Sequence, residues 1–509
     1  MIEIKEDSII GVIGVCGING NLIARILSDH NYEVLANDIQ SKEKCRFKEA
    51  LKEYPDIQII HGDLPEDFLD KIDYIVLPAA MIESESELYR KAIENDVKML
   101  TVGDILELFE PSHPVICVTG TNGKTTTTSL LKEIAYQNDI IPVEHGLEKM
   151  QGNNGDIPQL QSRLVADVSI LETGTFGQKG SLKRTVQQCL PDVGIITNIT
   201  PDHLINGKDF LNYAKVKGEI IPSLENGTLI INNDDPMIKA LVKEHNYQGN
   251  LITFGLDYPI TNKATKKCLC GHDVKMDEII SGCGKYACDC GISYSRPDYL
   301  AHTINDAHDS FVLKTPAGNE YEFNLSINGL HNIYNAVGVI VIAHEILGLS
   351  LEQIAKTLSS FEGVSGRMES IGTINDVEVM VDYAHNPAGI KTILKELKNH
   401  YSKVVNVLTV SSESGIEADM EILECSLVYA DYVVPASHNT YICAQKLLDE
   451  GKYVDKIILP GNMPEGDKKG TLGANKEQVI TGFSKASEID VDLIVCTGEA
   501  AFKYKDELL

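Results

Sequence analysis

The residues most able to do chemistry in this 509-residue chain lie in a short stretch of glycine, threonine and lysine, TGTNGKTTT at residues 119–127. Backbone N–H groups of such a loop, and the positive end of a helix after it, converge on one point and hold phosphate oxygens. Lys124 adds a positive charge, and Thr125 can offer its hydroxyl to the magnesium ion that accompanies a nucleoside triphosphate. We therefore expect an ATP site formed by Gly120, Thr121, Asn122, Gly123, Lys124, Thr125 and Thr126.

Polar groups also follow two apolar runs further along the chain. Residues 168–171 lead directly into Glu172, and residues 193–196 lead towards Asn198, Asp202 and His203. Open α/β sheets present their ligand-binding groups where strands end. A single glutamate at such a place is usually solvated. Its combination with Asp202 and His203 after a phosphate-binding loop favours a functional site instead.

Two cysteine pairs with one residue between the members form a third candidate site. The pairs are Cys268 with Cys270 and Cys288 with Cys290, and each is followed by glycine. Four thiolates can hold a structural zinc ion in tetrahedral geometry. The spacing differs from the usual Cys-x-x-Cys, so His272 or Cys283 could replace one ligand, and four reduced cysteines without metal remain the alternative.

The elements needed to position these groups can be read from the apolar spacing. An apolar run at residues 114–118 predicts a buried strand before the phosphate-binding loop, and residues 125–136 have helical spacing after it. Residues 9–38 show the same strand, glycine turn, helix and strand order, with glycines at 14, 17 and 20 and an acidic residue, Asp38, at the end. The glycine spacing is not the dinucleotide fingerprint, so we expect a Rossmann-like layer rather than an NAD site.

Charge and composition narrow the class of protein. The chain has 45 Lys+Arg against 74 Asp+Glu, a net charge of −29, which repels nucleic acids and anionic membranes. The longest apolar run, around residues 336–343, is too short to span a bilayer, and no secretory signal is visible. We expect a cytoplasmic monomer or weak oligomer whose twelve cysteines are thiols or metal ligands rather than disulfides.

The phosphate-binding stretch also carries a family resemblance. Where the common P-loop pattern has its first glycine this chain has Val118, and the shortened form at residues 120–126 resembles the Mur ligase family. These ATP-dependent enzymes join amino acids to a nucleotide-linked precursor, and folylpolyglutamate synthases are their relatives. The motifs around Glu172, Asn198 to His203, Asn332, Arg367 and Asp382 to His385 are similar to those of the family.

The resemblance implies a role for each of these residues. Glu172 would bind one magnesium ion, with Thr125, and His203 a second. Asn332 would face adenine, Arg367 the phosphates and Asp382 the nucleotide sugar. The first domain would hold the UDP part of the substrate, and the implied substrate-binding residues are Gly14, Cys16, Gly17, Asn19, Asp38, Asn198 and His385.

Lys217 has a special place in this resemblance. The family carries a lysine at this position that reacts with CO2, giving N6-carboxylysine, an anion able to hold magnesium. A lysine reacts in this way only when neutral, so we expect Lys217 to be partly desolvated or near other cations. Lys215 is the second candidate, and an ordinary solvated lysine is the simpler alternative.

These observations together predict an α/β chain of three domains. Residues 1–111 would form a Rossmann-like domain for the UDP-linked precursor, and residues 112–362 a central P-loop ATPase domain with a zinc ribbon-like insert at 263–300. Residues 363–509 would form a Rossmann-like α/β domain that binds the incoming amino acid. Within this third domain, strands are expected at 404–410, 432–435, 456–459 and 493–496.

The expected function is ATP-dependent formation of an amide bond between an amino acid and a UDP-linked cell-wall peptide precursor, through an acyl phosphate. Lys124, Glu172, His203 and Lys217 would form the catalytic set. The cysteine insert and the divergent third domain favour a pseudomurein ligase over a murein ligase. Alternatives are an amidating Mur-like subunit that works with a glutaminase, a folylpolyglutamate-type ligase, and an inactive nucleotide-binding scaffold.

Overall fold

The N-terminal residues form a parallel five-stranded sheet of Rossmann type in the order β3-β2-β1-β4-β5. In this computed structural model the described residues are 4–144, 156–175, 177–200, 210–411, 415–461 and 474–509. The strands are β1 (Ile9–Ile13), β2 (Glu33–Asp38), β3 (Gln58–His61), β4 (Tyr74–Val76) and β5 (Lys98–Leu100). The helices are α1 (Ile18–Asp29), α2 (Lys48–Lys52), α3 (Ala79–Glu83), α4 (Glu87–Glu94) and α5 (Val102–Leu108).

One expectation for this sheet is wrong. Cys16 and Cys45 are joined in a disulfide, whereas we expected the cysteines to be thiols or metal ligands. The reason is topological. β1 and β2 are paired in parallel, so the segments that follow them lie at the same edge of the sheet, and the two Cα atoms are 5.0 Å apart. The other ten cysteines are free.

The central sheet has eight strands in the order β16-β15-β14-β10-β9-β8-β6-β7, parallel from β7 to β14 and antiparallel beyond. Every residue of β6 is buried, as expected of a parallel strand covered on both faces. The strands are β6 (Val115–Thr119), β7 (Ser169–Glu172), β8 (Val193–Ile196), β9 (Thr228–Asn232), β10 (Asn250–Leu256), β14 (Tyr299–His302), β15 (Ser310–Lys314) and β16 (Glu320–Asn324). The helices are α6 (Lys124–Gln137), α7 (Ile157–Gln161), α8 (Ser181–Cys189), α9 (Phe210–Lys217), η3 (Gly218–Leu224), α10 (Pro236–His245), α11 (Leu330–Glu345) and α12 (Leu351–Leu358).

A separate antiparallel sheet interrupts the central unit between β10 and β14, in the region where we expected a zinc ribbon-like insert. Its strands are β11 (Asn262–Lys267), β12 (Asp273–Ile280) and β13 (Cys283–Ala287). The residues buried beneath it make a small cluster that includes Cys268, Val274 and Tyr286. We call residues 262–292 the cysteine insert.

The C-terminal sheet has the order β17-β18-β21-β19-β20, with only β17 antiparallel. The strands are β17 (Glu369–Ile374), β18 (Val377–Asp382), β19 (Val404–Leu408), β20 (Tyr432–Pro435) and β21 (Leu493–Thr497). The helices are α13 (Pro387–His400), α14 (Ile416–Tyr429), α15 (His438–Asp449), α16 (Lys476–Ala486) and α17 (Glu499–Lys503). The strand expected at 456–459 is reduced to a single bridge between Val433 and Ile457.

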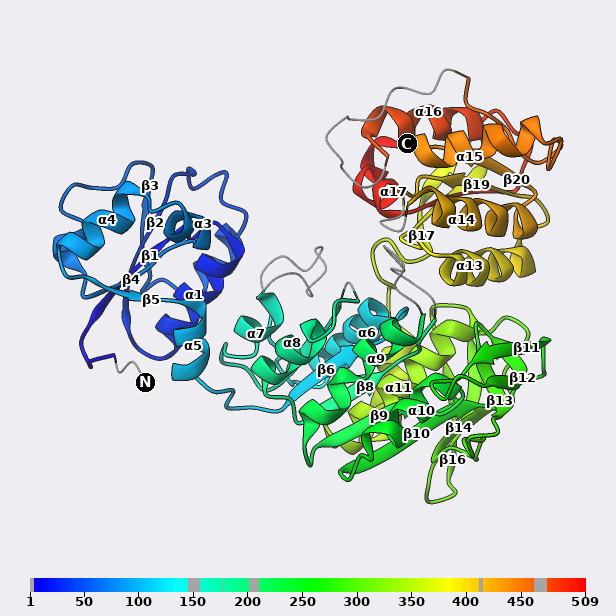
Figure 1. Ribbon diagram of the computed structural model, residues 1–509, viewed down its shortest axis with the longest axis horizontal. Coiled ribbons are helices and arrows are strands. Elements are labelled where there is room, and N and C mark those ends of the chain that lie inside the picture. The colour runs from blue at the N-terminus through cyan, green and yellow to red at the C-terminus, as the bar shows by residue number, and fades with distance from the viewer. Residues whose placement is uncertain (1–3, 145–155, 176, 201–209, 412–414, 462–473) are drawn as a thin grey trace.

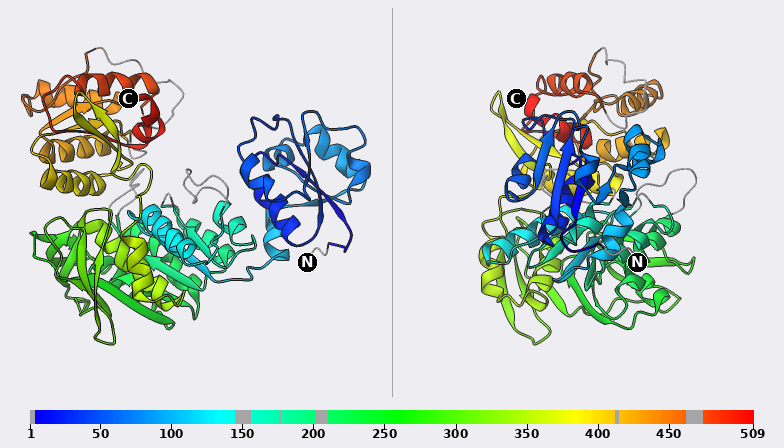
Figure 2. Two further views of the ribbon diagram at one scale, coloured as in Figure 1. Left: turned by 180° about the vertical axis from the view of Figure 1, so that it is seen from behind. Right: turned by 90° about the vertical axis from the view of Figure 1, so that its left-hand side faces the viewer.

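The three α/β units lie in a bent arrangement (Figure 1), and the views of Figure 2 show the N-terminal and C-terminal units on different parts of the central one. The N-terminal unit meets the central one through α1 and α7, whose buried residues belong to one hydrophobic cluster. The C-terminal unit sits above the end of the central sheet where α6 begins. Among the described residues, no helix is long and apolar enough to cross a membrane.

Candidate active site

The phosphate-binding loop has the backbone that its glycines require. β6 ends at Thr119 and α6 begins at Lys124, with Gly120 at φ 145° and Gly123 at φ 84° between them. A Cβ atom on Gly120 would lie 2.0 Å from Thr197 Oγ1, and one on Gly123 would lie 2.3 Å from Asn335 Oδ1. Only glycine combines these torsions with such close neighbours, so the loop and the start of α6 depend on both positions.

The turn after β8, residues 197–200, holds this loop from one side. The Thr121 N–H donates to the Asn198 carbonyl at 2.8 Å, and the Asn122 N–H donates to Asn198 Oδ1 at 3.1 Å. The Thr121 hydroxyl donates to the Thr200 carbonyl at 3.1 Å. Asn198 therefore supports the loop through its backbone and its side chain, a contact that the sequence did not predict.

Glu172 and Thr125 meet at the carboxyl end of neighbouring strands. β6 and β7 are paired in parallel, and the Thr125 hydroxyl donates to Glu172 Oε2 at 2.9 Å. Arg367 reaches the same hydroxyl from the C-terminal unit, with Nη2 3.3 Å from Thr125 Oγ1. A carboxylate beside a hydroxyl is the oxygen-rich environment that magnesium prefers.

Lys217 is among the largest fully buried side chains, with 2% exposure, and lies at the end of α9. Its Nζ is 5.4 Å from the centre of the Tyr213 ring, and the Tyr213 hydroxyl is 3.2 Å from the Thr121 hydroxyl of the loop. Lys215 differs, because its side chain is 52% exposed and its Nζ pairs with Glu244. His203, with Asp202, lies outside the described residues.

The C-terminal unit supplies groups to the other side of the site. Burial raises the pKa of Asp382, which is 2% exposed, although Arg367 opposes this shift. Its carboxylate accepts from the N–H groups of Met368 at 2.8 Å and Ala384 at 2.7 Å. Asn332, at the start of α11, donates to the Asn328 carbonyl at 2.7 Å.

One cavity of about 1100 Å³ connects these groups between the central and C-terminal units. Because both units contribute to its walls, a nucleotide in the cavity would contact both. The predicted residues that line it are Thr121, Asn122, Gly123, Lys124, Thr125, Thr126, Glu172, Asn198, Lys217, Asn332, Arg367, Asp382 and His385.

Several lining residues were missed by sequence reasoning. Asn335 lies one turn after Asn332 on α11, and the i, i+3 spacing could have revealed it. Tyr383 lies under Arg367, whose guanidinium carbon is 4.9 Å from the ring centre. Burial raises the pKa of Tyr383, and nearby Glu499, at the start of α17, acts in the same direction. No motif in the sequence indicated Glu499.

The residues predicted for the UDP part lie apart from this cavity, at the end of the N-terminal sheet. Asp38 accepts from the Cys16 N–H at 2.8 Å, which fixes the glycine turn between β1 and α1. Gly14 has a φ of 82°, and Gly17 caps α1. Asn19 donates to Asp156 of the central unit at 3.1 Å.

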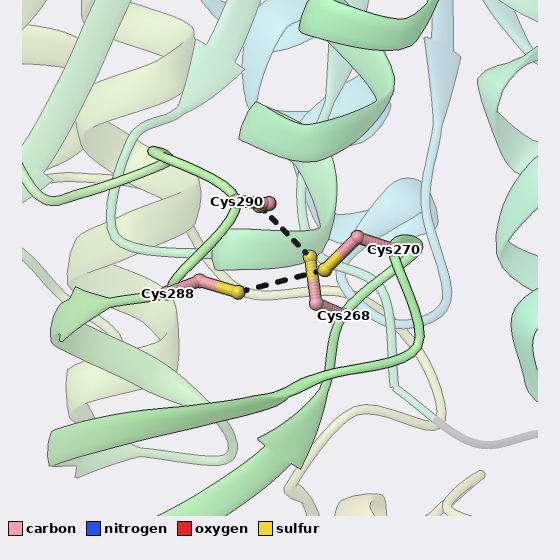
Figure 3. A group of neighbouring side chains, drawn as sticks. All are labelled: Cys268, Cys270, Cys288 and Cys290. Atoms are coloured by element: carbon pink, nitrogen blue, oxygen red, sulfur yellow. Dashed lines mark hydrogen bonds between the residues drawn. The ribbon is translucent and has the colours of Figure 1, made fainter.

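The two cysteine pairs converge, as Figure 3 shows. The Sγ atoms of Cys268 and Cys290 are 3.7 Å apart, and those of Cys270 and Cys288 are 3.6 Å apart. All four sulfur atoms lie within 4.8 Å of one another. Tetrahedral zinc with bonds of about 2.3 Å separates its sulfur ligands by roughly 3.8 Å, so the four side chains fit this ion.

The alternative zinc ligands are placed less well. Cys283 is buried at the active-site cavity, where Asn232 donates to its sulfur at 3.6 Å. His272 lies beside the cluster, with Nδ1 3.4 Å from Cys270 Sγ. The backbone hydrogen bond from His272 and the His272 side chain lower the pKa of the Cys270 thiol to about 6, although desolvation acts in the opposite direction. A lower pKa favours the thiolate, which is the form that binds a metal.

Two family descriptions match the chain, and together they span both walls of the cavity. Residues 118–343 match the Mur ligase middle domain, and residues 366–499 match the Mur ligase, glutamate ligase domain. A UDP-N-acetylmuramoylalanine–D-glutamate ligase from Caldanaerobacter subterraneus is 30% identical over 77% of this chain and 75% of its own. This chain belongs to the Mur ligase family.

Other Mur ligases are similar over nearly the whole length. A UDP-N-acetylmuramate–L-alanine ligase from Clostridium acetobutylicum is 26% identical over 98% of this chain and 97% of its own. The structure of a pseudomurein peptide ligase type C from Methanothermus fervidus is 33% identical, with a TM-score of 0.86 and 99% of each chain covered. The present chain is thus an ATP-dependent acid–amino acid ligase of the Mur type. Mur ligases use ATP and magnesium.

Proposed function

We propose that this Mur ligase adds an amino acid to a UDP-linked peptide precursor of pseudomurein. The full-length similarity to a pseudomurein peptide ligase supports this choice of polymer over murein. The observation that carries the proposal is the shared cavity, because it brings Lys124, Glu172 and Lys217 of the central unit together with Arg367 and Asp382 of the C-terminal unit.

In this proposal the chain's own residues activate a substrate carboxylate. The loop N–H groups, Lys124 and Arg367 hold the ATP phosphates and neutralise the charge that develops as the carboxylate attacks the γ-phosphate. Magnesium would be held by Thr125, Glu172, His203 and the carboxylated form of Lys217, and it would supply further positive charge at the phosphate oxygens. This attack breaks the bond between the β- and γ-phosphates, so ADP leaves and an acyl phosphate forms. The amine of the incoming amino acid then attacks the acyl carbon, loses a proton and displaces inorganic phosphate.

The remaining site residues divide between nucleotide and substrate. Asn332 and Asp382 would hold the adenine and the ribose, and His385 and Asn198 the reacting parts of the substrate. Gly14, Cys16, Gly17, Asn19 and Asp38 would hold the UDP part. We place the domain limits at 111 and 362, and the separate sheets on either side of each limit support this division.

The cysteine cluster supports a second part of the proposal, a structural zinc ion on Cys268, Cys270, Cys288 and Cys290. The cysteine insert also supports one alternative activity, because it resembles the cysteine ribbon of the Mur-like subunit that amidates murein precursors. That activity would use ammonia delivered by a glutaminase in place of an amino acid.

The test is a screen of phosphate release with purified chain, MgATP, UDP-linked precursors and amino acids, with ammonium as a separate arm. We expect release only with one precursor and one amino acid together. Lys124→Ala should reduce this release at least about a hundredfold without changing the fold, as expected for loss of a preorganised charge. Release that requires ammonium instead would assign the amidating activity, and near-normal turnover of Lys124→Ala would overturn the proposed ATP site.

A further inference from the structure

A lysine of the cysteine insert contacts the central unit near the phosphate-binding loop. Lys266 lies on β11, two residues before Cys268, and its side chain is only 11% exposed. Its Nζ is 2.9 Å from Oδ1 of Asp235, whose side chain is fully buried, and 3.0 Å from the carbonyl oxygen of Ile199. The next residue, Lys267, points elsewhere, because it is 62% exposed and pairs with Asp273.

Lys266 and Asp235 together hold both backbone polar groups of Ile199. The Ile199 N–H donates to Asp235 Oδ2 at 2.7 Å, while the Ile199 carbonyl accepts from Lys266. Asp235 also caps α10 by accepting from the Met237 N–H at 2.9 Å. Ile199 is therefore fixed between the insert and the start of α10.

Ile199 is the middle of the turn that holds the phosphate-binding loop. Its neighbours Asn198 and Thr200 make the contacts to Thr121 and Asn122 described above. A displacement of Ile199 would move these neighbours, since adjacent Cα atoms are joined at a fixed distance. Ile199 thus connects the buried Lys266–Asp235 pair to Asn198 and Thr200, which contact the phosphate-binding loop.

The same insert also touches the opposite wall of the cavity. The turn between β12 and β13 places the Ser281 hydroxyl 2.7 Å from that of Thr392 on α13. Ile280, Ser281 and Cys283 line the active-site cavity themselves. The insert is consequently a part of the site rather than an appendage of the central domain.

We propose that Lys266 is a positioning residue for ATP binding, acting through Asp235 and the 197–200 turn on the phosphate-binding loop. The inference rests on the proposed ATP site. Without the lysine, Asp235 would keep a buried negative charge with no cation beside it, and the backbone of Ile199 would lose one of its two hydrogen-bond partners. A shift of the turn would separate the loop N–H groups from their phosphate-binding arrangement.

The experiment is calorimetric titration of the full chain with MgATP, which needs no knowledge of the peptide substrate. Lys266→Met should raise the Kd for MgATP about tenfold or more, the size of coupling expected between residues in one hydrogen-bonded network. Lys266→Arg, which keeps the cation, should recover part of the affinity, and the control Lys267→Met should bind like wild type.

Calorimetry separates positioning from mere destabilisation. Loss of folded protein lowers the number of sites per chain and leaves the Kd of the remaining sites unchanged, whereas a displaced loop raises the Kd at full occupancy. If Lys266→Met does not fold, Asp235→Asn weakens the same pair at nearly constant volume and should also raise the Kd. A wild-type Kd in the folded variant, or only a reduced number of sites, overturns the inference. No MgATP binding by wild type would overturn the ATP site itself.

Discussion

At the scale of one residue, Lys217 is a lysine whose side chain is almost fully buried. Its ammonium would be nearly inaccessible to water in a cavity that also holds Lys124 and the proposed magnesium ligands. At about 4 Å, like charges in a partly dry site repel by several kcal/mol. Reaction with CO2 would replace this cation by an anion with two oxygen ligands, which suits magnesium.

The first prediction follows from this environment. Lys217→Ala should be nearly inactive in phosphate release, and acetate or formate should partly restore activity by filling the vacated anion site. Lys215→Ala is the matched control and should stay active, because Lys215 is half exposed on the same helix. No rescue by either acid, combined with an unmodified ammonium in a high-resolution map of the ATP complex, would rule out carboxylysine.

His331 gives a prediction about pH. Burial lowers its pKa to about 4 from the ordinary 6.5, and its buried Nδ1 has no hydrogen-bond partner among the described residues. Between pH 4 and pH 6.5, His331 is therefore protonated in the unfolded chain and neutral in the folded chain. The contribution to stability is complete above pH 6.5 and falls as the pH drops towards 4, by about 3 kcal/mol in all.

Urea unfolding at pH 7 and pH 5 measures this effect. From pH 7 to pH 5 the wild type should lose about 2 kcal/mol through His331 alone. In His331→Gln the difference in the free energy of unfolding between the two pH values should shrink by this amount. An unchanged difference would show that His331 is not kept neutral by the fold.

At the scale of the element, the cysteine insert has too small a core to explain its order. Three short strands and a few buried residues supply little apolar burial, so a metal ion is expected to contribute a large share of its stability. The matching turns at Gly271 and Gly291, with φ of 86° and 87°, aim the four thiols inward.

Metal analysis of protein purified without chelator should therefore find about one zinc ion per chain. The double variant Cys268→Ser, Cys288→Ser should lose it, and hydrogen exchange should accelerate at residues 263–300 while MgATP binding remains measurable. Cys425→Ser, a half-buried thiol outside the cluster, should keep the metal. Wild-type protein without zinc would show that the cluster is not a zinc site.

At the scale of the whole molecule, the cavity proposed as the active site lies between the central and C-terminal units. Arg367 crosses from the C-terminal unit to Thr125 at the start of α6, and it stacks on Tyr383 of its own unit. A guanidinium can make both contacts at once because it is planar and has several donors. ATP binding would add phosphate contacts to this crossing and favour closure of the two units.

Arg367→Met should consequently lower kcat at least tenfold and raise the KM for ATP, on the scale of losing one charged contact to the transition state. Lys403→Met removes a cation that is half exposed and pairs with Asp490, so it should leave both constants unchanged. Equal kinetics for the Arg367 variant and wild type would contradict a site shared between the domains.

The local features of this protein can be predicted from its amino-acid sequence. The glycines at 120 and 123 predict the phosphate-binding loop, and the apolar run before them predicts a strand. The Cys-x-Cys spacing, which occurs twice, predicts the two cysteine turns. Each of these features can be recognised from a short segment, although distant residues such as Thr197 and Asn335 also restrict the loop glycines. The motifs also identified the family, which the matches to the middle and C-terminal domains bear out.

Which distant groups meet depends on the tertiary structure. The fold buries Lys217 and leaves Lys215 exposed, joins Cys16 to Cys45, brings Arg367 to Thr125, and places Lys266 beside Asp235. Each of these contacts depends on strand order and on how the domains pack, and side-chain type sets neither. Local periodicity shows which face of an element is buried, but the partner on that face is fixed only when the whole chain has packed.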